Sequence, residues 1–163
     1  MKVKFVADEK YRPQYANDTD ACMDLKAKIE ENIVYRSNGE IDMEKTIYDR
    51  IFIQPGETVK VHSGVQAAVP EGYVMKMYVR SSTGIKKNLV LANGTGIIDA
   101  GYRDEIIMAL HNIGKESVEI KDGDRICQFI ILPYPKIEAE YVEDDENFRQ
   151  GDRGGGIGST GTN

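Results

Sequence analysis

Short runs of alternating hydrophobic and polar residues recur along the chain, and turn-forming segments such as PGE, PEG, NGTG and KDGD separate them. Alternation with a period of two is typical of strands that bury one face. The spacing of about ten residues between runs favours an all-β sandwich or barrel. The runs that predict strands are residues 3–7, 50–54, 58–69, 72–79, 88–93, 105–113 and 118–132.

Helical periodicity is scarce, and one short helix is expected at the segment SSTGIKKN, residues 81–88. Ser81 or Ser82 is the expected N-cap, because serine hydroxyls accept hydrogen bonds from the first free backbone N–H groups of a helix. Lys86 and Lys87 follow toward the C-terminal end, where positive charge is favourable. The fold class is therefore all-β with one short helix.

The chain divides by composition into a β domain at residues 1–137, an acidic linker at 138–150 and a glycine-rich arm at 151–163. Within the domain, residues 31–50 are polar and strand-like, and they turn at Asn38–Gly39, a strong hairpin signal. We expect this hairpin to be an insertion in the domain. The linker is predicted to be exposed, because residues 138–148 carry six acidic side chains and few candidates for a core.

The overall charge limits the partners that the protein can bind. The chain has 21 basic and 27 acidic side chains, which gives a formal net charge of −6. A non-specific nucleic-acid binder needs a field of lysine and arginine, so we expect no nucleic-acid partner. No apolar run reaches the length of a membrane span or resembles a signal peptide, so we expect no membrane partner and a cytoplasmic location.

The cysteine and histidine content also limits the chemistry. Cys22 and Cys127 allow one disulfide, although two buried thiols fit a cytosolic protein better. His62 and His111 are the two histidines, and neither has a second histidine or cysteine at the spacing of metal ligands. The sequence therefore offers no zinc motif and no serine-hydrolase motif.

The densest group of polar residues lies at 78–106, YVRSSTGIKKNLVLANGTGIIDAGYRDEI. Arg80, Ser81 and Ser82 lead into the expected helix, where hydroxyls and backbone N–H groups are able to bind an anion. Taken alone, they are more typical of an ordinary helix cap with a surface arginine. Asp99, in the segment DAGY, is either a general base that deprotonates water or an aspartate that opens a turn.

Two further segments contribute polar residues. Asp24 lies between apolar residues in ACMDLKA, where a strand would expose it on one face. Arg125 and Gln128 lie in GDRICQFIIL, around a strand that is expected to be buried. The final residues, GDRGGGIGSTGTN, include the G-x-x-x-x-G spacing of a phosphate loop at 156–161, but Thr162 stands where that loop needs lysine. The arm has the composition of a phosphate-wrapping segment without being a Walker motif.

In order, these segments resemble the five motifs of the trimeric dUTP pyrophosphatases (dUTPases). The five segments are ACMDLKA, RSSTG, NGTGIIDAGYRDE, GDRICQFII and RGGGIGSTG. The resemblance runs from about residue 16 to the end and leaves the hairpin at 31–50 over. It implies a jelly-roll subunit, a homotrimer with active sites shared between subunits, and hydrolysis of dUTP to dUMP and pyrophosphate with Mg²⁺.

The resemblance also implies a role for individual residues. Asp99 matches the base that orients the attacking water, and Tyr102 matches the aromatic residue that packs on the deoxyribose. Asp24 and Gln128 match residues that hold phosphate and the waters of the metal. The residues that match uracil recognition are Asn93, Gly96, Ile97 and the backbone near Ile107, and those that match phosphate binding are Arg80, Ser81 and Ser82.

The C-terminal arm resembles a lid that becomes ordered when the nucleotide binds. Ser159 and Thr160 would supply hydroxyls to the triphosphate, Gly158 belongs to the same GSTG segment, and Arg153 is the expected clamp for the outer phosphates. Ile157 stands where the family usually has an aromatic residue, so it would cover the uracil without stacking on it. The segment is one residue short, which makes Arg149 an alternative clamp.

Two alternative functions remain open at the level of sequence. The RSS of the second motif is similar to that of dCTP deaminases, but the glutamate that their chemistry needs aligns with Ala109. A dUTPase-like protein that acts as a nucleotide-sensing interaction module is the other alternative, with the hairpin at 31–50 as the surface for a protein partner.

Overall fold

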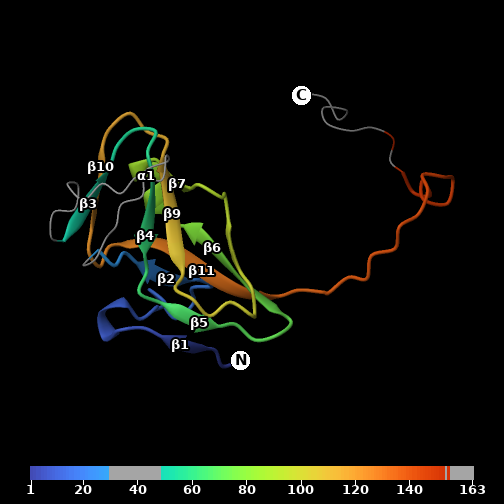
Figure 1. Ribbon diagram of the computed structural model, residues 1–163, viewed down its shortest axis with the longest axis horizontal. Coiled ribbons are helices and arrows are strands. Elements are labelled where there is room, and N and C mark those ends of the chain that lie inside the picture. The colour runs from blue at the N-terminus through green and yellow to red at the C-terminus, as the bar shows by residue number, and fades with distance from the viewer. Residues whose placement is uncertain (30–48, 153, 155–163) are drawn as a thin grey trace.

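The computed structural model describes residues 1–29, 49–152 and 154, and it has the expected all-β architecture with one short α-helix. Figure 1 shows the strands gathered in one body, from which the C-terminal segment runs outward. The strands of the described residues form several small sheets and no closed barrel. The predicted insertion lies almost entirely outside the described residues, and only its last two positions, Asp49 and Arg50, are seen.

The described residues form eleven strands, one α-helix and one 3-10 turn. In chain order these are β1 (Lys4–Val6), η1 (Glu9–Tyr11), β2 (Met23–Lys26), β3 (Arg50–Ile53), β4 (Thr58–His62), β5 (Gln66–Ala68), β6 (Tyr73–Val79), α1 (Ser81–Lys87), β7 (Leu89–Leu91), β8 (Gly96–Ile98), β9 (Ile107–Asn112), β10 (Val118–Lys121) and β11 (Arg125–Pro133).

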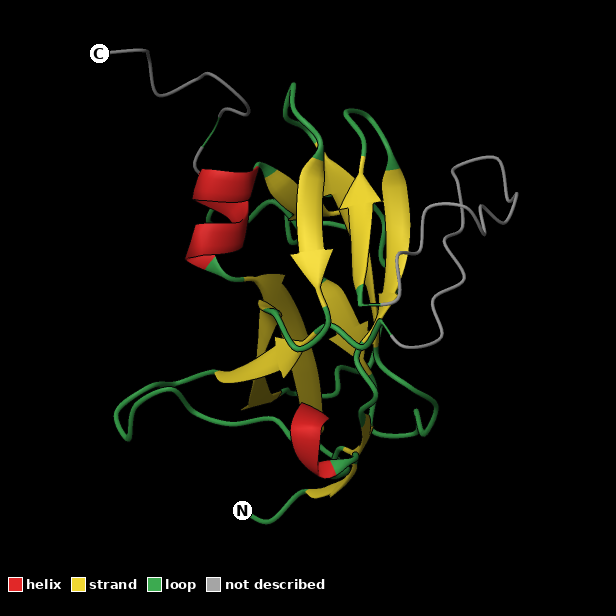
Figure 2. Ribbon diagram, turned by 90° about the vertical axis from the view of Figure 1, so that its left-hand side faces the viewer, coloured by secondary structure: helices red, strands yellow, loops and turns green. Residues whose placement is uncertain are grey.

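All pairs between these strands are antiparallel. The largest sheet has the order β2-β11-β6-β8, a second has the order β4-β9-β7, and two strand pairs, β1-β5 and β10-β3, complete the body. In Figure 2, α1 lies beside the upper strands and the short η1 lies near the lower end of the body. The candidate site residues described below come from the four-stranded sheet, the turns on either side of β8, the start of α1 and the start of β9.

Alternating burial along the strands builds the core, as the sequence pattern predicts. On β4, for example, Val59 and Val61 are buried while Lys60 between them is exposed. Residues two apart on a strand point to the same face, so one apolar row from each strand meets inside the body. The largest fully buried side chains are Tyr11, Leu25, Ile29, Ile51, Ile53, Met75, Leu89, Ile106, Met108, Leu110, Ile120 and Phe129.

Two expectations about strand boundaries need correction. The run at 58–69 is broken into β4 and β5 by a turn at Ser63–Val65, in which Gly64 has a φ of +67°. A left-handed residue interrupts the alternation of a strand, and glycine adopts it without steric cost. The segment Gly96–Ile98, expected only as part of a motif, is strand β8 and pairs with β6.

The helix forms where expected, but the predicted cap is wrong. Its N-cap is Arg80, which has extended φ and ψ angles and no side-chain capping bond. The Arg80 N–H donates to the carbonyl of Ile126 on β11, while the Arg80 carbonyl accepts the first helical bond from the Gly84 N–H. The helix therefore begins at Ser81 and ends at Lys87, and its C-cap Asn88 has a left-handed φ of 53°.

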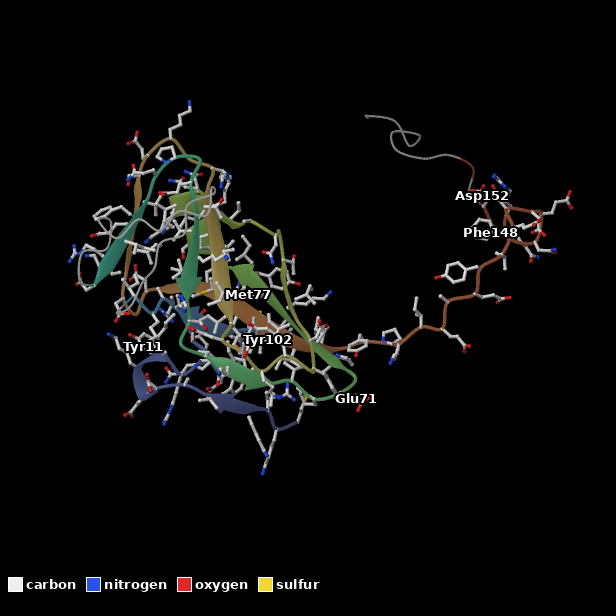
Figure 3. All side chains as sticks on the ribbon, in the orientation of Figure 1. Tyr11, Glu71, Met77, Tyr102, Phe148 and Asp152 are labelled. Atoms are coloured by element: carbon white, nitrogen blue, oxygen red, sulfur yellow. The ribbon has the colours of Figure 1, made fainter. Side chains whose placement is uncertain are left out.

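The C-terminal segment leaves the body after β11. Residues 134–152 are exposed along their whole length and include no strand or α-helix. Figure 3 shows Phe148 and Asp152 far from Tyr102 and Met77 in the body. The arm residues Arg153, Ile157, Gly158, Ser159 and Thr160 lie outside the described residues.

Both cysteines are free thiols, as the sequence favours, although Cys22 is only half-buried. Burial raises the pKa of the Cys127 thiol to about 12. In the described part of the chain, no helix has the length and apolar character needed to cross a membrane.

Candidate active site

A pocket of about 240 Å³ lies beside β8 and brings together six of the sequence-predicted site residues, five from the third motif and Ile107. Met77 and Tyr102, labelled in Figure 3, are two of its walls. The residues that line it are Met77, Asn93, Gly96, Ile97, Ile98, Asp99, Tyr102, Ile106 and Ile107. The lining is mostly apolar with a few polar groups, which is the usual character of a small-molecule site.

Strand β8 forms one wall of this pocket because of its register with β6. Gly96 lies opposite Met77, and Ile98 lies opposite Met75. A Cβ atom on Gly96 would come within 2.7 Å of the Met77 Cε atom and 3.0 Å of its Cβ atom, so no side chain fits here. Gly96 lets the two strands approach closely. Ile97, the next residue of β8, points to the other face and is 54% exposed.

The turn before β8 positions Asn93 at the rim of the pocket. Gly94 donates its N–H to the Leu91 carbonyl at 2.9 Å and has a φ of +71°, which closes a tight turn after β7. The Thr95 N–H donates to the Asn93 carbonyl at 2.8 Å. The exposed Asn93 side chain is therefore held on a short and well-defined connection.

The turn after β8 positions Asp99 and Tyr102. The Tyr102 N–H donates to the Asp99 carbonyl at 3.1 Å, and the Arg103 guanidinium donates to the Ala100 carbonyl at 2.5 Å and the Tyr102 carbonyl at 2.7 Å. These bonds close the turn around Gly101. The exposed Asp99 carboxylate forms no hydrogen bond with any described residue, which leaves it free to bind a water molecule or a ligand.

Tyr102 lies at the mouth of the pocket with 38% of its surface exposed. Its hydroxyl donates a hydrogen bond of 2.7 Å to the Glu105 carbonyl. Burial raises the pKa of the Tyr102 hydroxyl, and the negative charges of Asp104 and Glu105 raise it further. The hydroxyl is therefore a protonated donor at neutral pH.

A second polar group surrounds Asp24 on the four-stranded sheet. The Asp24 side chain is only 8% exposed, and it pairs with the Arg80 Nε atom at 2.9 Å and the Arg125 Nη1 atom at 3.1 Å. The expectation that its strand exposes Asp24 is wrong, because the two arginines cover it. One carboxylate between two guanidinium groups leaves a net charge of about +1, which attracts an anion.

Gln128 belongs to the same group by register. It lies opposite Asp24 on β2 and opposite Tyr78 on β6. Directly opposed residues of antiparallel strands share a face and lie within reach of each other. This row alternates with the core row of the same strands, so it lies on the face directed away from the core.

Ser81 and Ser82 follow Arg80 at the start of α1, and both are exposed. Their hydroxyls form no hydrogen bond within the described part of the chain. Arg80, Ser81 and Ser82 therefore present one guanidinium and two hydroxyl groups next to the Asp24 group.

The single chain does not join the two groups. Neither Asp24, Arg80 nor Gln128 lines the pocket, and no hydrogen bond or ion pair between described residues links the groups. Arg149, the alternative clamp, lies in the C-terminal segment and pairs with Asp144. The sequence-predicted residues are thus gathered in two places.

Sequence reasoning missed residues that complete each group. Arg125 was noted but not assigned a role, although its position three residues before Gln128 on the fourth motif was a usable signal. Met77, Ile98 and Ile106 line the pocket as ordinary core residues, and nothing in their local sequence distinguishes them from the rest of the core.

The described residues offer no protein-only metal centre. They contain no group of three or more histidine, cysteine, aspartate or glutamate side chains able to hold a metal ion. Asp24 is the one carboxylate of the second group, and its oxygens are engaged by two arginines. A divalent cation at this site would need most of its oxygen ligands from a bound substrate.

Comparisons with known proteins identify the family of this chain. The dUTPase family model matches residues 42–161. The chain is 34% identical over 164 residues to the deoxyuridine 5′-triphosphate nucleotidohydrolase of Desulfitobacterium hafniense DCB-2, and the match covers 99% of this chain and 95% of that protein.

Solved structures show the same fold. The dUTPase of Streptococcus mutans superposes with a TM-score of 0.65 at 25% identity, covering 85% of this chain and all of that chain. A dUTPase variant of Staphylococcus bacteriophage 80α, solved with dUpNHpp, has a TM-score of 0.76 at 23% identity and covers 99% of both chains. On the family match, the near full-length identity and the shared fold, the chain belongs to the dUTPase family.

Proposed function

We propose that this chain hydrolyses dUTP to dUMP and pyrophosphate, with Asp99 aligning the attacking water. One observation carries the proposal: in a member of the dUTPase family, the pocket beside β8 combines Asn93, a side-chain-free wall at Gly96, Tyr102 and an Asp99 carboxylate that pairs with no described residue. Together these groups would bind a base, a sugar and an attacking water molecule side by side.

The nucleoside would bind in the pocket. Asn93 and the backbone of β8 near Gly96 and Ile97 would bind the edge of uracil, with the Ile107 backbone on the other side. A site that offers fixed backbone donors and acceptors mispairs with cytosine, and such sites reject an analogue by roughly 10⁴–10⁵-fold. The Tyr102 ring would pack on C2′ of the deoxyribose and leave no room for a ribose hydroxyl.

The triphosphate would bind at the second group. Arg80, Ser81 and Ser82 supply charge and hydroxyl donors, and Gln128 adds an amide on the neighbouring strand. Arg125 and Arg80 both pair with the Asp24 carboxylate, so Arg80 would keep hydrogen-bond donors available for phosphate. Such charge-assisted hydrogen bonds are the strongest ones that a protein offers to phosphate.

Magnesium fits the site as a part of the substrate. Mg²⁺ prefers oxygen ligands and keeps several waters, so the phosphates of dUTP would supply its first ligands. Asp24 and Gln128 would contact its water molecules rather than the ion itself. Bound in this way, the ion neutralises phosphate charge that develops during the reaction.

The proposed chemical step is a direct attack by water, with no covalent intermediate, and it depends mainly on Asp99. The oxygen of water attacks the α-phosphorus, the bond from that phosphorus to the bridging oxygen breaks, and pyrophosphate leaves with the electron pair. The Asp99 carboxylate accepts the proton of the water. Because a carboxylate is a weak base toward water, its main contribution is to hold the water in line with the leaving group.

The separation of the two groups in a single chain supports a site shared between copies. Each pocket would meet the Arg80 group of a neighbouring subunit, so that a homotrimer carries three sites. Light scattering tests the assembly, and a clear monomer that is fully active would contradict it. The arm with Arg153, Ile157, Gly158, Ser159 and Thr160 would then close over the triphosphate as a lid.

The test is pyrophosphate release from dUTP, dCTP, dTTP and UTP in the presence of Mg²⁺. We expect release from dUTP alone, and we expect Asp99→Asn to lower kcat by about 10²–10⁴-fold while the protein stays folded. Ammonia release from dCTP would instead favour a deaminase, which is disfavoured because Ile107, Ala109 and His111 put no carboxylate on that face of β9. Folded protein that leaves dUTP intact contradicts the proposal.

A further inference from the structure

Glu105 links the Tyr102 loop to the turn between β4 and β5 through both of its carboxylate oxygens. Its Oε1 atom accepts the Gly64 N–H at 2.6 Å, and its Oε2 atom lies 2.8 Å from the His62 Nδ1 atom. The side chain is 30% exposed, so water screens these contacts only in part. Glu105 does not line the pocket, and no role in the reaction has been assigned to it above.

The backbone of the same segment adds two more links. The Tyr102 hydroxyl donates to the Glu105 carbonyl at 2.7 Å, and the Ile106 N–H donates to the Val65 carbonyl at 2.9 Å. Residues 102–106 are therefore tied to residues 62–65 by the Glu105 side chain and by the backbone. The hydroxyl end of the Tyr102 side chain is therefore held by Glu105, the residue whose carboxylate bonds to the turn.

The turn that receives Glu105 is itself tightly packed. Gly64 has a φ of +67°, and a Cβ atom there would meet the Lys28 Cδ atom at 3.0 Å and the Tyr11 ring at 3.3 Å. Tyr11 is buried and belongs to η1. Glu105 thus connects the loop at the pocket mouth to a part of the body that has little room to move.

We propose that Glu105 is a positioning residue that sets the selectivity for 2′-deoxyribose over ribose by fixing the Tyr102 ring, an inference that rests on the proposed function. Tyr102 is 38% exposed, so its packing holds only part of the ring. A ring that excludes one hydroxyl group must stay within a fraction of an ångström of its place. Glu105 provides that restraint through its carbonyl, and its carboxylate fixes the carbonyl in turn.

A purely structural role makes a different prediction. If Glu105 only stabilised the fold, its loss would reduce the amount of active protein and lower kcat/KM for dUTP and UTP by the same factor. A positioning role changes the ratio of the two values, because a loosened Tyr102 admits the ribose hydroxyl. The ratio of kcat/KM for dUTP to that for UTP is therefore the decisive measurement.

The variants are Glu105→Ala, Glu105→Gln and Tyr102→Phe, with Asp104→Ala as the matched control. Asp104 directly precedes Glu105, is exposed, and its side chain makes no hydrogen bond to a described residue. We expect Glu105→Ala to lower the dUTP-to-UTP ratio by about tenfold and Asp104→Ala to leave it unchanged. Glu105→Gln should restore most of the ratio, since its amide oxygen still accepts the Gly64 N–H and its amide nitrogen can donate to His62.

Tyr102→Phe keeps the ring and removes its hydroxyl tether. We expect it to lower the ratio as Glu105→Ala does, and the double variant to add little, because both changes break the same restraint. Additive losses of the two variants, or an unchanged ratio in Glu105→Ala, would overturn the inference.

The outcome is separable from a failure of the proposed function. Wild-type protein that releases no pyrophosphate from dUTP contradicts the function. In that case, calorimetry with dUMP and UMP still decides the Glu105 inference: a preference for dUMP that weakens in Glu105→Ala supports it, and no preference in the wild type overturns it.

Discussion

Gly94 and Gly96 lie two residues apart in one motif, yet the structure requires glycine at each for a different reason. Gly94 has a φ of +71°, and a Cβ atom there would meet open space. Gly96 is a strand residue whose Cβ atom would collide with Met77. The sequence does not reveal the collision, because Met77 becomes a neighbour of Gly96 only through the register of β6 and β8.

Replacing Gly96 by alanine should therefore damage the pocket. The Met77 Cε atom can rotate away, but its Cβ atom at 3.0 Å cannot, so β8 must shift. We expect Gly96→Ala to raise KM for dUTP by about tenfold and to cost about 1–3 kcal/mol of stability. Kinetics and thermal unfolding measure both effects.

Gly84→Ala is the matched control for this substitution. Gly84 lies inside α1, and a Cβ atom there meets its nearest neighbour, the Val79 Cγ2 atom, at an ordinary 3.6 Å. Alanine has the higher helix propensity, so we expect stability to rise by about 0.5–1 kcal/mol. Gly96→Ala with unchanged KM and unchanged melting temperature would contradict the steric explanation.

Asp24 shows why single polar residues are hard to interpret from sequence. Its position between apolar residues predicted a strand, and β2 is that strand. Its partners Arg80 and Arg125 come from the ends of two other strands, β6 and β11, and no local pattern reports that these ends meet. Asp24 was therefore expected on the surface, because the two arginines that bury it are distant in the sequence.

At the scale of elements, the strands and most breaks between them were predictable, because the strands alternate and turn-forming residues separate them. Two local details were not: the turn at Ser63–Val65 interrupts an apparently continuous strand, and Arg80 is the helix N-cap where Ser81 offered a better one. In both places a hydrogen bond to a distant segment accompanies the local structure. The Gly64 N–H donates to the Glu105 carboxylate, and the Arg80 N–H donates to the Ile126 carbonyl.

One element-scale contact fixes the N-terminal segment to the turn between β10 and β11. Asp122 in that turn has a side chain only 6% exposed, and it accepts hydrogen bonds from Lys10, from the Tyr11 hydroxyl at 2.9 Å and from the Ile29 N–H at 2.8 Å. Burial by itself raises the pKa of the Asp122 carboxyl, but these bonds together outweigh it and lower the pKa below its ordinary value.

Asp122→Asn should destabilise the fold by about 1–3 kcal/mol at neutral pH, since it removes the charge that these donors face. A lowered folded-state pKa stabilises the fold above the ordinary aspartate pKa of about 4, and the gain is lost as pH falls through the folded-state value. The difference in unfolding free energy between wild type and variant should therefore be constant above about pH 5 and shrink below it.

Urea unfolding across this pH range measures the difference, with the exposed Asp18→Asn as a control for the lost charge. A difference that stays the same at low pH would contradict the assignment to Asp122.

At the scale of the whole molecule, the fold class followed from alternation, and the candidate site followed from the resemblance of the ordered motifs to a family. The resemblance implied active sites shared between subunits, but neither source gave the positions of the site residues in space. The pocket beside β8 and the charged group around Asp24 are separate in one chain, and no pattern along a single sequence states which copies meet. Assembly is therefore the feature on which the account depends most.

Mixing two inactive variants tests that feature directly. Asp99→Asn removes the carboxylate that we propose aligns the water, and Arg80→Ala removes a proposed phosphate-binding group while Arg125 stays beside Asp24. If each site takes Asp99 from one copy and Arg80 from another, random co-assembly of the two variants gives about one quarter of the sites both intact residues.

The measurement is pyrophosphate release from dUTP by the co-expressed variants, purified as one oligomer, beside each variant alone. The account predicts almost no release by either variant and about one quarter of wild-type release by the mixture. Mixed oligomers that are no more active than their parents would place both groups in one chain and contradict the shared site.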